Sequence, residues 1–335
     1  MALMCCPSCN GSNVKTIGEL IKIPGLFDLP NPGCLYHCES CNLYFRHLFF
    51  SPNELAEAYG QIAETNWSYR ERRNDYRLAF ETIIQLKKSG KILDIGCYRG
   101  DFLQLFPDPF YRYGIEPSIA AARIAMGKGV RIVGKTLETF ESKNMRFDII
   151  TLIDVLEHLP SPFLALSKLA PLLNRNGILI ISTGNTDALP WRLMRQDYWY
   201  YASEHVSFFN PKWFRWAAQQ LDLAFVGVKR FSHQEGSALE RWRQFAQCLT
   251  FIALKNLDCH PLLKKMISRI YPFNRAIHWT TSPPNWLWKD HQLVTLQSIN
   301  SPRKHNVCCL DLHEPPEPPE RQRGLSMDRI IDAGT

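Results

Sequence analysis

Short apolar runs alternate with segments of helical periodicity through the middle of the chain, from Lys91 onward. The runs that predict strands are KILDI, YRYGIE, VRIV, FDIITLI, GILIIST, AFVGVKRF and HQLVTLQSI. The segments that predict helices include GCYRGDFLQLF, PSIAAARIAMGK, PSPFLALSKLAPLL and PKWFRWAAQQLDL. Strands that alternate with helices build a mainly parallel sheet covered on both faces. The pattern therefore predicts an α/β domain with a seven-stranded sheet.

The flanking segments have other patterns, which divide the 335-residue chain into parts. We expect a small cysteine-rich module at 1–50, followed by a helical linker at 51–88 with apolar residues at three- and four-residue spacing. The α/β domain would occupy 89–300, with a helical insertion at 236–288 before its last strand. Residues 301–335 are rich in proline and charge, which predicts a disordered tail.

Composition and charge narrow the class of protein. Apolar residues make up 45% of the chain, enough for a sizeable core, yet no apolar run reaches the roughly 20 residues that span a bilayer. The first residues lack the basic and apolar regions of a secretory signal, so we expect a cytoplasmic protein whose eleven cysteines are thiols or metal ligands. The net charge of +7 permits an anionic partner without requiring one.

Much of the positive charge lies in the insertion. Between Gly236 and Asp290 there are eight Lys and Arg residues and three acids, 8 − 3 = +5. Basic helices with apolar stretches are compatible with peripheral contact with an anionic membrane or with a phosphate-bearing acceptor. A solvated helical cover with a charged outer face is the alternative.

Two Cys-x-x-Cys pairs lie near the amino terminus. Cys6 and Cys9 form the first pair, and Cys38 and Cys41 form the second. This spacing lets two thiolates reach one ion, so the four cysteines predict a tetrahedral zinc site with no open position, which is structural and not catalytic. Asn10-Gly11 and Asn42 follow the pairs and suit the left-handed turn that often ends such a knuckle. Buried structural thiols are the alternative, and Cys5 or His37 could replace a ligand.

A candidate cofactor motif follows the first strand of the α/β domain. Asp94-Ile-Gly96-Cys-Tyr-Arg-Gly100 combines an acid inside the strand with glycines that permit a tight turn, and Glu116 ends the next strand. A carboxylate at that strand end can accept from both hydroxyls of a ribose, while Asp94 could hold the ammonium of an amino acid. A cofactor with ribose, adenine and an amino acid is S-adenosylmethionine. The structural alternative is that Asp94 and Gly96 only shape a turn and that Glu116 only caps a helix.

The chain resembles the class I S-adenosylmethionine-dependent methyltransferases, particularly the branch with an amino-terminal zinc module found among sugar and small-molecule methyltransferases. The matching segments are CPSC…CESCNLYFRHLFFSPNELAEAY, LDIGCYRGDFL, GIEPS, FDIITLIDVLEHLPSP, GILIISTGN and EHVSFFNPKWF. Tyr98 departs from the family, which usually has a small residue there. The resemblance implies a Rossmann-like methyltransferase sheet and S-adenosylmethionine as cofactor.

The resemblance also assigns roles to individual residues. It implies that Asp154, after the fourth strand, lies near the methionine part of the cofactor, although a solvated loop acid is nearly as good an interpretation. It implies that His205, supported by Glu204, is the general base, with local packing of the loop as the alternative. We expect a structural role for His158. The aromatic run at Trp191 and 198–201 suits packing, stacking on a sugar, or covering a sulfonium cation.

These features favour methyl transfer to a sugar, a glycan precursor or another small acceptor, including one linked to a nucleotide or lipid. The first alternative is an RNA methyltransferase, which the missing Asn-Pro-Pro-aromatic motif makes a poorer fit, so a nucleic-acid partner is not expected. The second alternative is a non-catalytic zinc-bearing binding protein.

Overall fold

The computed structural model describes residues 4–20, 33–46 and 73–299, except for short gaps at 143, 203–204, 234–235, 258–259, 268 and 271–287. Residues 51–72 of the expected linker, the expected tail and Glu204 lie outside the described residues. The rest of the linker forms the predicted helix, α2 (Asn74–Leu86). Across the described ranges, every helix is too short or too polar to cross a membrane.

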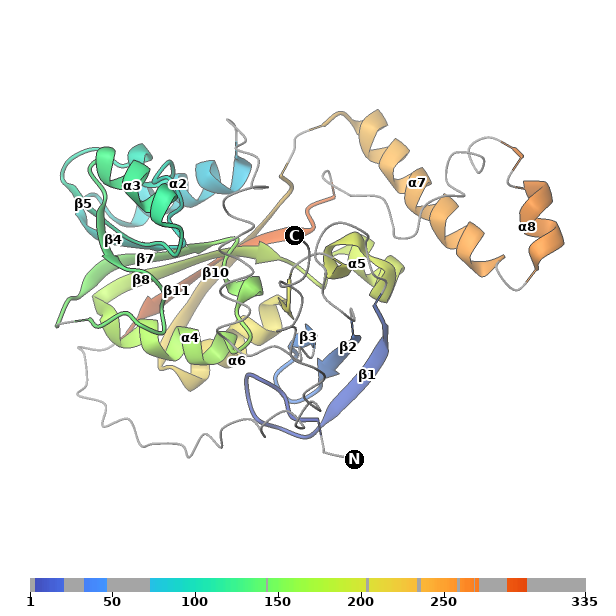
Figure 1. Ribbon diagram of the computed structural model, residues 1–335, viewed down its shortest axis with the longest axis horizontal. Coiled ribbons are helices and arrows are strands. Elements are labelled where there is room, and N and C mark those ends of the chain that lie inside the picture. The colour runs from blue at the N-terminus through green and yellow to red at the C-terminus, as the bar shows by residue number, and fades with distance from the viewer. Residues whose placement is uncertain are drawn as a thin grey trace, which may run out of the picture. The chain divides into compact units, whose positions relative to one another are not determined.

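A seven-stranded sheet forms the centre of the molecule (Figure 1). Its strands, in spatial order, are β10 (Leu223–Phe231), β11 (His291–Ser298), β8 (Leu173–Gly184), β7 (Phe147–Ile153), β4 (Gly90–Ile95), β5 (Phe110–Ile115) and β6 (Arg131–Gly134). The strands from β8 to β6 are parallel, and β11 is antiparallel to both of its neighbours. All seven strands predicted from the sequence are present, in a Rossmann-like arrangement.

Side chains of alternate strand residues enter two cores on opposite faces of the sheet. Ile92, Ile149 and Ile180 face a core shared with helices α2 and α3 (Ile119–Gly127). Leu93 and Ile150 face the other core, which is shared with α4 (Pro162–Leu169) and α6 (Pro211–Gln220). Figure 1 shows these two pairs of helices on opposite sides of the sheet. Strands buried on both faces explain why these runs are almost wholly apolar.

One predicted helix is wrong. The segment GCYRGDFLQLF forms turns and a single 3-10 turn, Leu103–Leu105, instead of an α-helix. Phe102, Leu103 and Phe106 are all buried in one core, and Pro107 follows directly. A proline disfavours helical conformation in the residue before it, so this segment has no room for a longer helix.

A second, four-stranded antiparallel sheet lies at the amino-terminal part of the chain. It consists of β1 (Val14–Glu19), β2 (Cys34–Cys38), β3 (Tyr44–Arg46) and β9 (Ser207–Phe208). Strand β9 comes from the α/β domain and begins two residues after His205. The module at the amino terminus is therefore joined to the α/β domain by strand pairing.

The insertion before the last strand is helical, as predicted. Its described elements are α7 (Ala238–Asn256) and α8 (Pro261–Ile267). Ser237 begins α7 with a capping box, in which its hydroxyl accepts from the backbone of Glu240 and the Glu240 carboxylate accepts from the backbone of Ser237. A further short helix, α5 (Leu189–Met194), contains Trp191 of the aromatic run and contacts α7.

Candidate active site and metal centre

The four predicted cysteine ligands converge. The sulfur atoms of Cys6, Cys9, Cys38 and Cys41 all lie within 4.8 Å of one another. Cys6 Sγ is 3.5 Å from Cys41 Sγ, and Cys9 Sγ is 3.5 Å from Cys38 Sγ. Sulfur atoms around a tetrahedral zinc with bonds of about 2.3 Å would be about 3.8 Å apart, so the cluster has the size of a four-cysteine zinc site.

The backbone at each pair has the predicted knuckle geometry. Asn10 and Asn42 have φ angles of 53° and 64°, the left-handed region. Their N–H groups donate to the carbonyl oxygens of Cys6 and Cys38, at 2.9 and 2.8 Å. The Ser8 N–H also points at Cys6 Sγ, at 3.5 Å. An N–H group that points at a sulfur atom stabilises the thiolate, which is the form that binds a metal. Cys5 is exposed and, like His37, lies outside the cluster, so neither replaces a ligand.

The turn after β4 forms a backbone cradle. Gly96 and Gly100 both have positive φ, +70° and +74°. A Cβ atom added to Gly96 would lie 2.7 Å from Val155 Cγ2, so this position has no room for a side chain. Tyr98 has a φ of 47°, and its half-buried ring lies beside the Arg99 guanidinium. The tyrosine therefore adopts the backbone conformation that glycine usually supplies.

Glu116 lies at the carboxyl end of β5, directly beside this cradle. Its Oε2 accepts from the Tyr98 N–H at 2.7 Å and its Oε1 from the Ser118 N–H at 2.9 Å. These bonds fix the carboxylate while each oxygen retains a second lone pair for a ligand hydroxyl. Burial raises the pKa of Glu116, and the two backbone N–H groups oppose that rise.

Asp94 is buried near the carboxyl end of β4. Thr151 Oγ1 donates to its Oδ1 at 2.6 Å. Burial raises the pKa of Asp94 to about 7, and the Thr151 hydrogen bond and the Arg73 charge oppose the rise. A cationic ligand would stabilise the ionised form of this carboxyl group, because its charge would compensate for the hydration lost on burial.

Asp154, at the carboxyl end of β7, lies in a cluster of charges. Arg73 Nη2 donates to Asp154 Oδ2 at 2.5 Å and also pairs with the buried Asp75. A carboxylate oxygen of Asp75, a carboxylate oxygen of Asp154 and a ring nitrogen of His233 all lie within 4.8 Å of one another. Burial raises the pKa of Asp154 to about 6. Asp154 is thus held by a cation of the protein itself, and its φ of 53° is a strained backbone position next to the cradle.

His205 lies among buried polar groups. Its Nδ1 is 3.3 Å from the Tyr200 carbonyl oxygen, and its ring stacks on the Tyr200 ring with centroids 4.0 Å apart. Burial lowers the pKa of His205 to about 3, so the imidazole is neutral at ordinary pH. Tyr200 OH donates to Glu157 Oε1 at 2.8 Å, and burial raises the pKa of Glu157 to about 8. His158 packs beside His205, with ring centroids 4.8 Å apart.

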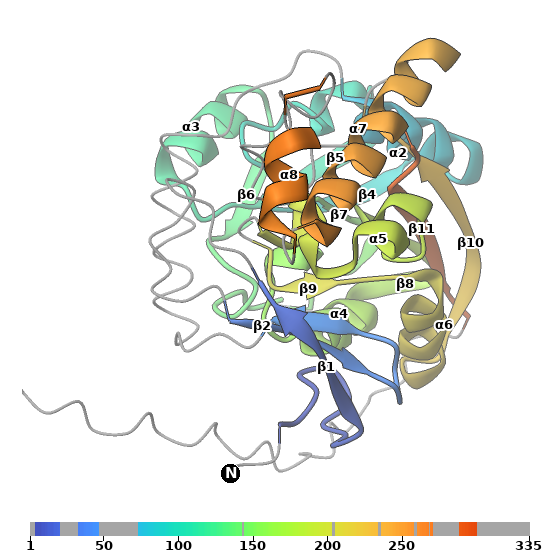
Figure 2. The same ribbon diagram turned by 90° about the vertical axis from the view of Figure 1, so that its right-hand side faces the viewer.

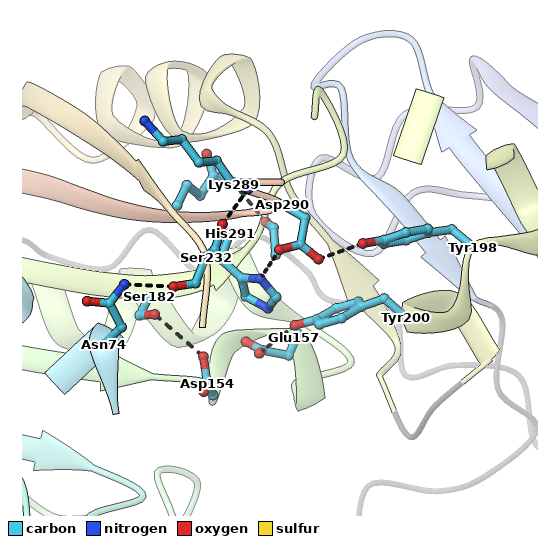
Figure 3. A network of polar contacts seen from close by, with 12 residues as sticks. Asn74, Asp154, Glu157, Ser182, Tyr198, Tyr200, Ser232, Lys289, Asp290 and His291 are labelled. Carbon is cyan, nitrogen blue, oxygen red and sulfur yellow. Dashed lines mark hydrogen bonds and ion pairs between the residues drawn. The ribbon is translucent and has the colours of Figure 1, made fainter. Parts of the chain in front are cut away.

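A second histidine, which the sequence reasoning missed, lies close by. His291 Nδ1 is 2.9 Å from Asp290 Oδ1, and Tyr198 OH donates to Asp290 Oδ2 at 2.5 Å (Figure 3). Burial alone would lower the pKa of His291, but the Asp290 carboxylate raises it. The signal in the sequence was an adjacent Asp-His pair at the start of a buried strand, where two polar residues must find partners.

The aromatic run is buried, which favours packing over an exposed binding surface. Trp191, Tyr198, Tyr200 and Tyr201 are each at most 3% exposed and form one cluster with Phe208. Tyr198 and Tyr200 nevertheless turn their hydroxyl groups toward Asp290 and Glu157, as Figure 3 shows. The aromatic rings thus build an apolar wall, and their hydroxyl groups hold the acids of the site.

The carboxyl ends of β4 and β5 therefore carry the cradle, and those of β7 and β8 carry the polar network. Ser182 of β8 links the two strands, because its Oγ lies 3.5 Å from Asp154 Oδ1. Ligands of open α/β sheets bind at this edge. The arrangement can hold a cofactor over β4 and β5 and a second reactant over β7 and β8.

Comparisons with known proteins find methyltransferases. The sequence model of a family described as a methyltransferase domain matches residues 67–228. The chain is 33% identical over 109 residues to the ubiquinone biosynthesis O-methyltransferase of Azorhizobium caulinodans, covering 29% of this chain and 42% of the relative. The same enzyme of Histophilus somni is 28% identical over 165 residues, covering 43% and 68%.

The chain spans about two-fifths of the length of the first of these relatives. Among solved structures, the plantazolicin methyltransferase in complex with a desmethyl analogue and S-adenosylhomocysteine is similar, with a TM-score of 0.46 and 16% identity. That match covers 74% of this chain and 98% of the other.

Proposed function

We propose that this chain, which contains a class I S-adenosylmethionine-dependent methyltransferase domain, transfers a methyl group from S-adenosylmethionine to a small-molecule acceptor. The observation that carries the proposal is the pairing of a backbone cradle beside Glu116, at β4 and β5, with a buried acid–histidine network at β7 and β8. The cofactor, when bound, supplies an electrophilic methyl group on a sulfonium.

The residues of the cradle fit this cofactor. Glu116 would accept from the ribose hydroxyls, since its carboxylate is already oriented by two backbone N–H groups. Asp94 would pair with the ammonium of the methionine part. Burial raises the pKa of Asp94, and a cationic ligand would stabilise its ionised form. Gly96 and Gly100 let the backbone approach the cofactor closely. Asp154 would face the methionine part from β7.

We propose His205 as the general base. In the tautomer with its proton on Nδ1, the imidazole donates to the Tyr200 carbonyl and Nε2 is the basic nitrogen. The lowered pKa keeps His205 unprotonated, and the stacked Tyr200 ring fixes its orientation. A pKa of about 3 makes a weak base, so proton transfer from a hydroxyl or carbon acid held in line with the methyl group requires a bound reactant to raise that pKa toward the working pH. Glu204, proposed as its support, lies outside the described residues.

The acceptor that we propose is a sugar or a similar small molecule with an ionisable hydroxyl or carbon, including one carried on a nucleotide or lipid. The buried carboxyl group of Glu157 suits recognition of a hydroxyl group. The relatives named for ubiquinone biosynthesis are O-methyltransferases, which supports an oxygen nucleophile. The cysteines described as free thiols suit the cytoplasm, where we place the reaction.

We also propose one structural zinc at Cys6, Cys9, Cys38 and Cys41. Four thiolates fill the coordination shell, so the metal takes no part in the chemistry. Its role would be to fix the amino-terminal sheet and, through the β3–β9 pairing, the segment that carries His205.

A comparison of His205→Ala with His158→Ala tests the proposed function. Both rings lie in the same network, so the second variant controls for disturbed packing. We expect His205→Ala to bind S-adenosylhomocysteine as the wild type does and to lower labelled methyl incorporation from S-adenosylmethionine about a hundred- to ten-thousandfold. The acceptor is supplied as a small-molecule extract, and its product is identified by a mass gain of one methyl group.

Incorporation by His205→Ala within a few-fold of wild type would exclude His205 as the base. Absence of cofactor binding by the wild-type chain would reject the methyltransferase proposal itself.

A further inference from the structure

Helix α7 has apolar side chains on two opposite faces. Cys248, Phe251 and Leu254 are buried, and the first two pack into the aromatic cluster around Trp191. Leu239, Trp242 and Leu249 are 79%, 64% and 46% exposed. At about 100° per residue these three residues share one face, which points away from the buried one. One apolar face of α7 is thus covered by the protein, and the other is open to solvent.

Helix α8 continues this exposed apolar surface. None of its described residues is buried. Leu262 and Met266 are 80% and 67% exposed, and Ile270, just beyond the helix, is 59% exposed. Figures 1 and 2 show α8 next to the carboxyl-terminal end of α7. We call Leu239, Trp242, Leu249, Leu262, Met266 and Ile270 the α7–α8 surface.

Basic residues are frequent on the two helices that carry the α7–α8 surface. The described residues between 236 and 270 include six Lys and Arg side chains (Arg241, Arg243, Lys255, Lys264, Lys265 and Arg269) and one acid, Glu240. Lys255 pairs with Asp197 on the body of the protein. Exposed leucine and tryptophan bordered by basic residues are the composition of helices that lie in the interface of a bilayer.

We propose that the α7–α8 surface docks on an anionic lipid bilayer. Charge complementarity selects this occupant, because each Lys or Arg near an anionic leaflet adds to binding, and the apolar side chains can enter the headgroup region. A second copy of this chain would bring the same positive charges against one another, which costs binding energy.

The insertion starts and ends at the candidate active site. The chain leaves β10 near Ser232 and returns to β11 at Lys289, whose N–H donates to Ser232 Oγ at 2.6 Å. Asp290 and His291 follow immediately. Docking would therefore attach to the bilayer the insertion whose ends flank His233, Asp290 and His291. This last consequence rests on the proposed function and would give the enzyme access to a lipid-linked acceptor.

Co-sedimentation of the full chain with vesicles tests the docking without any use of activity. We expect binding to vesicles of phosphatidylglycerol and phosphatidylcholine, and much weaker binding to phosphatidylcholine alone. Leu239→Ser with Trp242→Ser should weaken binding about tenfold or more, through loss of apolar insertion. The control is Tyr111→Ser, since Tyr111 on β5 is 64% exposed, the same as Trp242.

Charge is tested by Lys265→Glu with Arg269→Glu, which should weaken binding at least tenfold and remove its salt sensitivity. Lys91→Glu with Lys168→Glu is the matched control, because both lysines are exposed and lie away from the insertion. Equal binding to neutral vesicles, no binding, or equal loss in the control variants would overturn the proposal. A dimer in sedimentation velocity that Trp242→Ser dissociates would also overturn it, by assigning the surface to self-association.

Discussion

The buried carboxyl of Asp94 predicts that cofactor affinity depends on pH in a defined window. Its pKa is about 7 without ligand, and only the ionised form can pair with an ammonium. If the protonated form binds poorly, the apparent dissociation constant rises by a factor of about 1 + 10^(7 − pH). The factor is about 2 at pH 7, about 11 at pH 6 and about 100 at pH 5.

The direction of the pH dependence follows from which protonation form of Asp94 binds the cofactor. The pKa of Asp94 is raised, so affinity is full above about pH 7 and is lost as the pH falls through that value. Loss of the proton from the ligand's ammonium at higher pH should weaken this pairing again. The charged neighbours that act on Asp94 are Arg73, which favours ionisation, and Glu116, which opposes it.

The assay is calorimetric titration with S-adenosylhomocysteine from pH 5.5 to 8.5, on the wild type and Asp94→Asn. Asparagine keeps the shape and can still accept from Thr151 Oγ1, so the fold should persist. The variant should bind weakly at every pH and lose the slope between pH 5.5 and 7. A wild-type affinity that stays flat over this range, or a variant that keeps the slope, would refute the role of Asp94.

Three further outcomes follow from the geometry. Glu116→Ala should weaken S-adenosylhomocysteine binding about ten- to a hundredfold by calorimetry, because hydrogen bonds to a charged group contribute about 1.5–3 kcal/mol. Cys38→Ser should lower zinc per chain in elemental analysis and lower the melting temperature by more than Cys5→Ser does, because Cys5 lies outside the cluster. Gly96→Ala should weaken cofactor binding and lower the melting temperature, since the new Cβ meets Val155 in a left-handed position that costs about 1–2 kcal/mol. Val155→Ala in the same chain should restore part of that loss and no more, because it removes the clash but not the backbone strain.

Local sequence signals were sufficient for the sheet and the cysteine cluster. Apolar runs such as FDIITLI are short and bounded, and the knuckle spacing fixes which cysteines can meet. The helix expected after Gly100 failed because the packing of Phe102 and Phe106, together with Pro107, overrides the apolar spacing that suggested it.

The acid–histidine network was predicted only in part, for a physical reason. Asp75 and His291 lie far apart in the sequence, and both lie close to His233 only because β10 and β11 return beside β8. Hydrophobic periodicity is a local property of the sequence, so it cannot predict contacts between such distant residues. Burial of the aromatic run was likewise decided by α7, whose Cys248 and Phe251 cover it from a distant segment.

Strand β9 joins the cysteine-bearing sheet to the methyltransferase domain. Two residues after His205, the chain supplies the outer strand of the other sheet, and Asn210 Nδ2 donates to the Asn42 carbonyl at 3.2 Å. Trp213 Nε1 donates to Ser8 Oγ at 3.3 Å, and the buried cysteines share a core with α6. A fragment that lacks residues 1–50 would expose this core to solvent. It would also lose the strand pairing beside the segment that carries His205. We therefore expect a chelator that removes the proposed zinc to lower turnover at lower chelator concentrations than it lowers cofactor affinity.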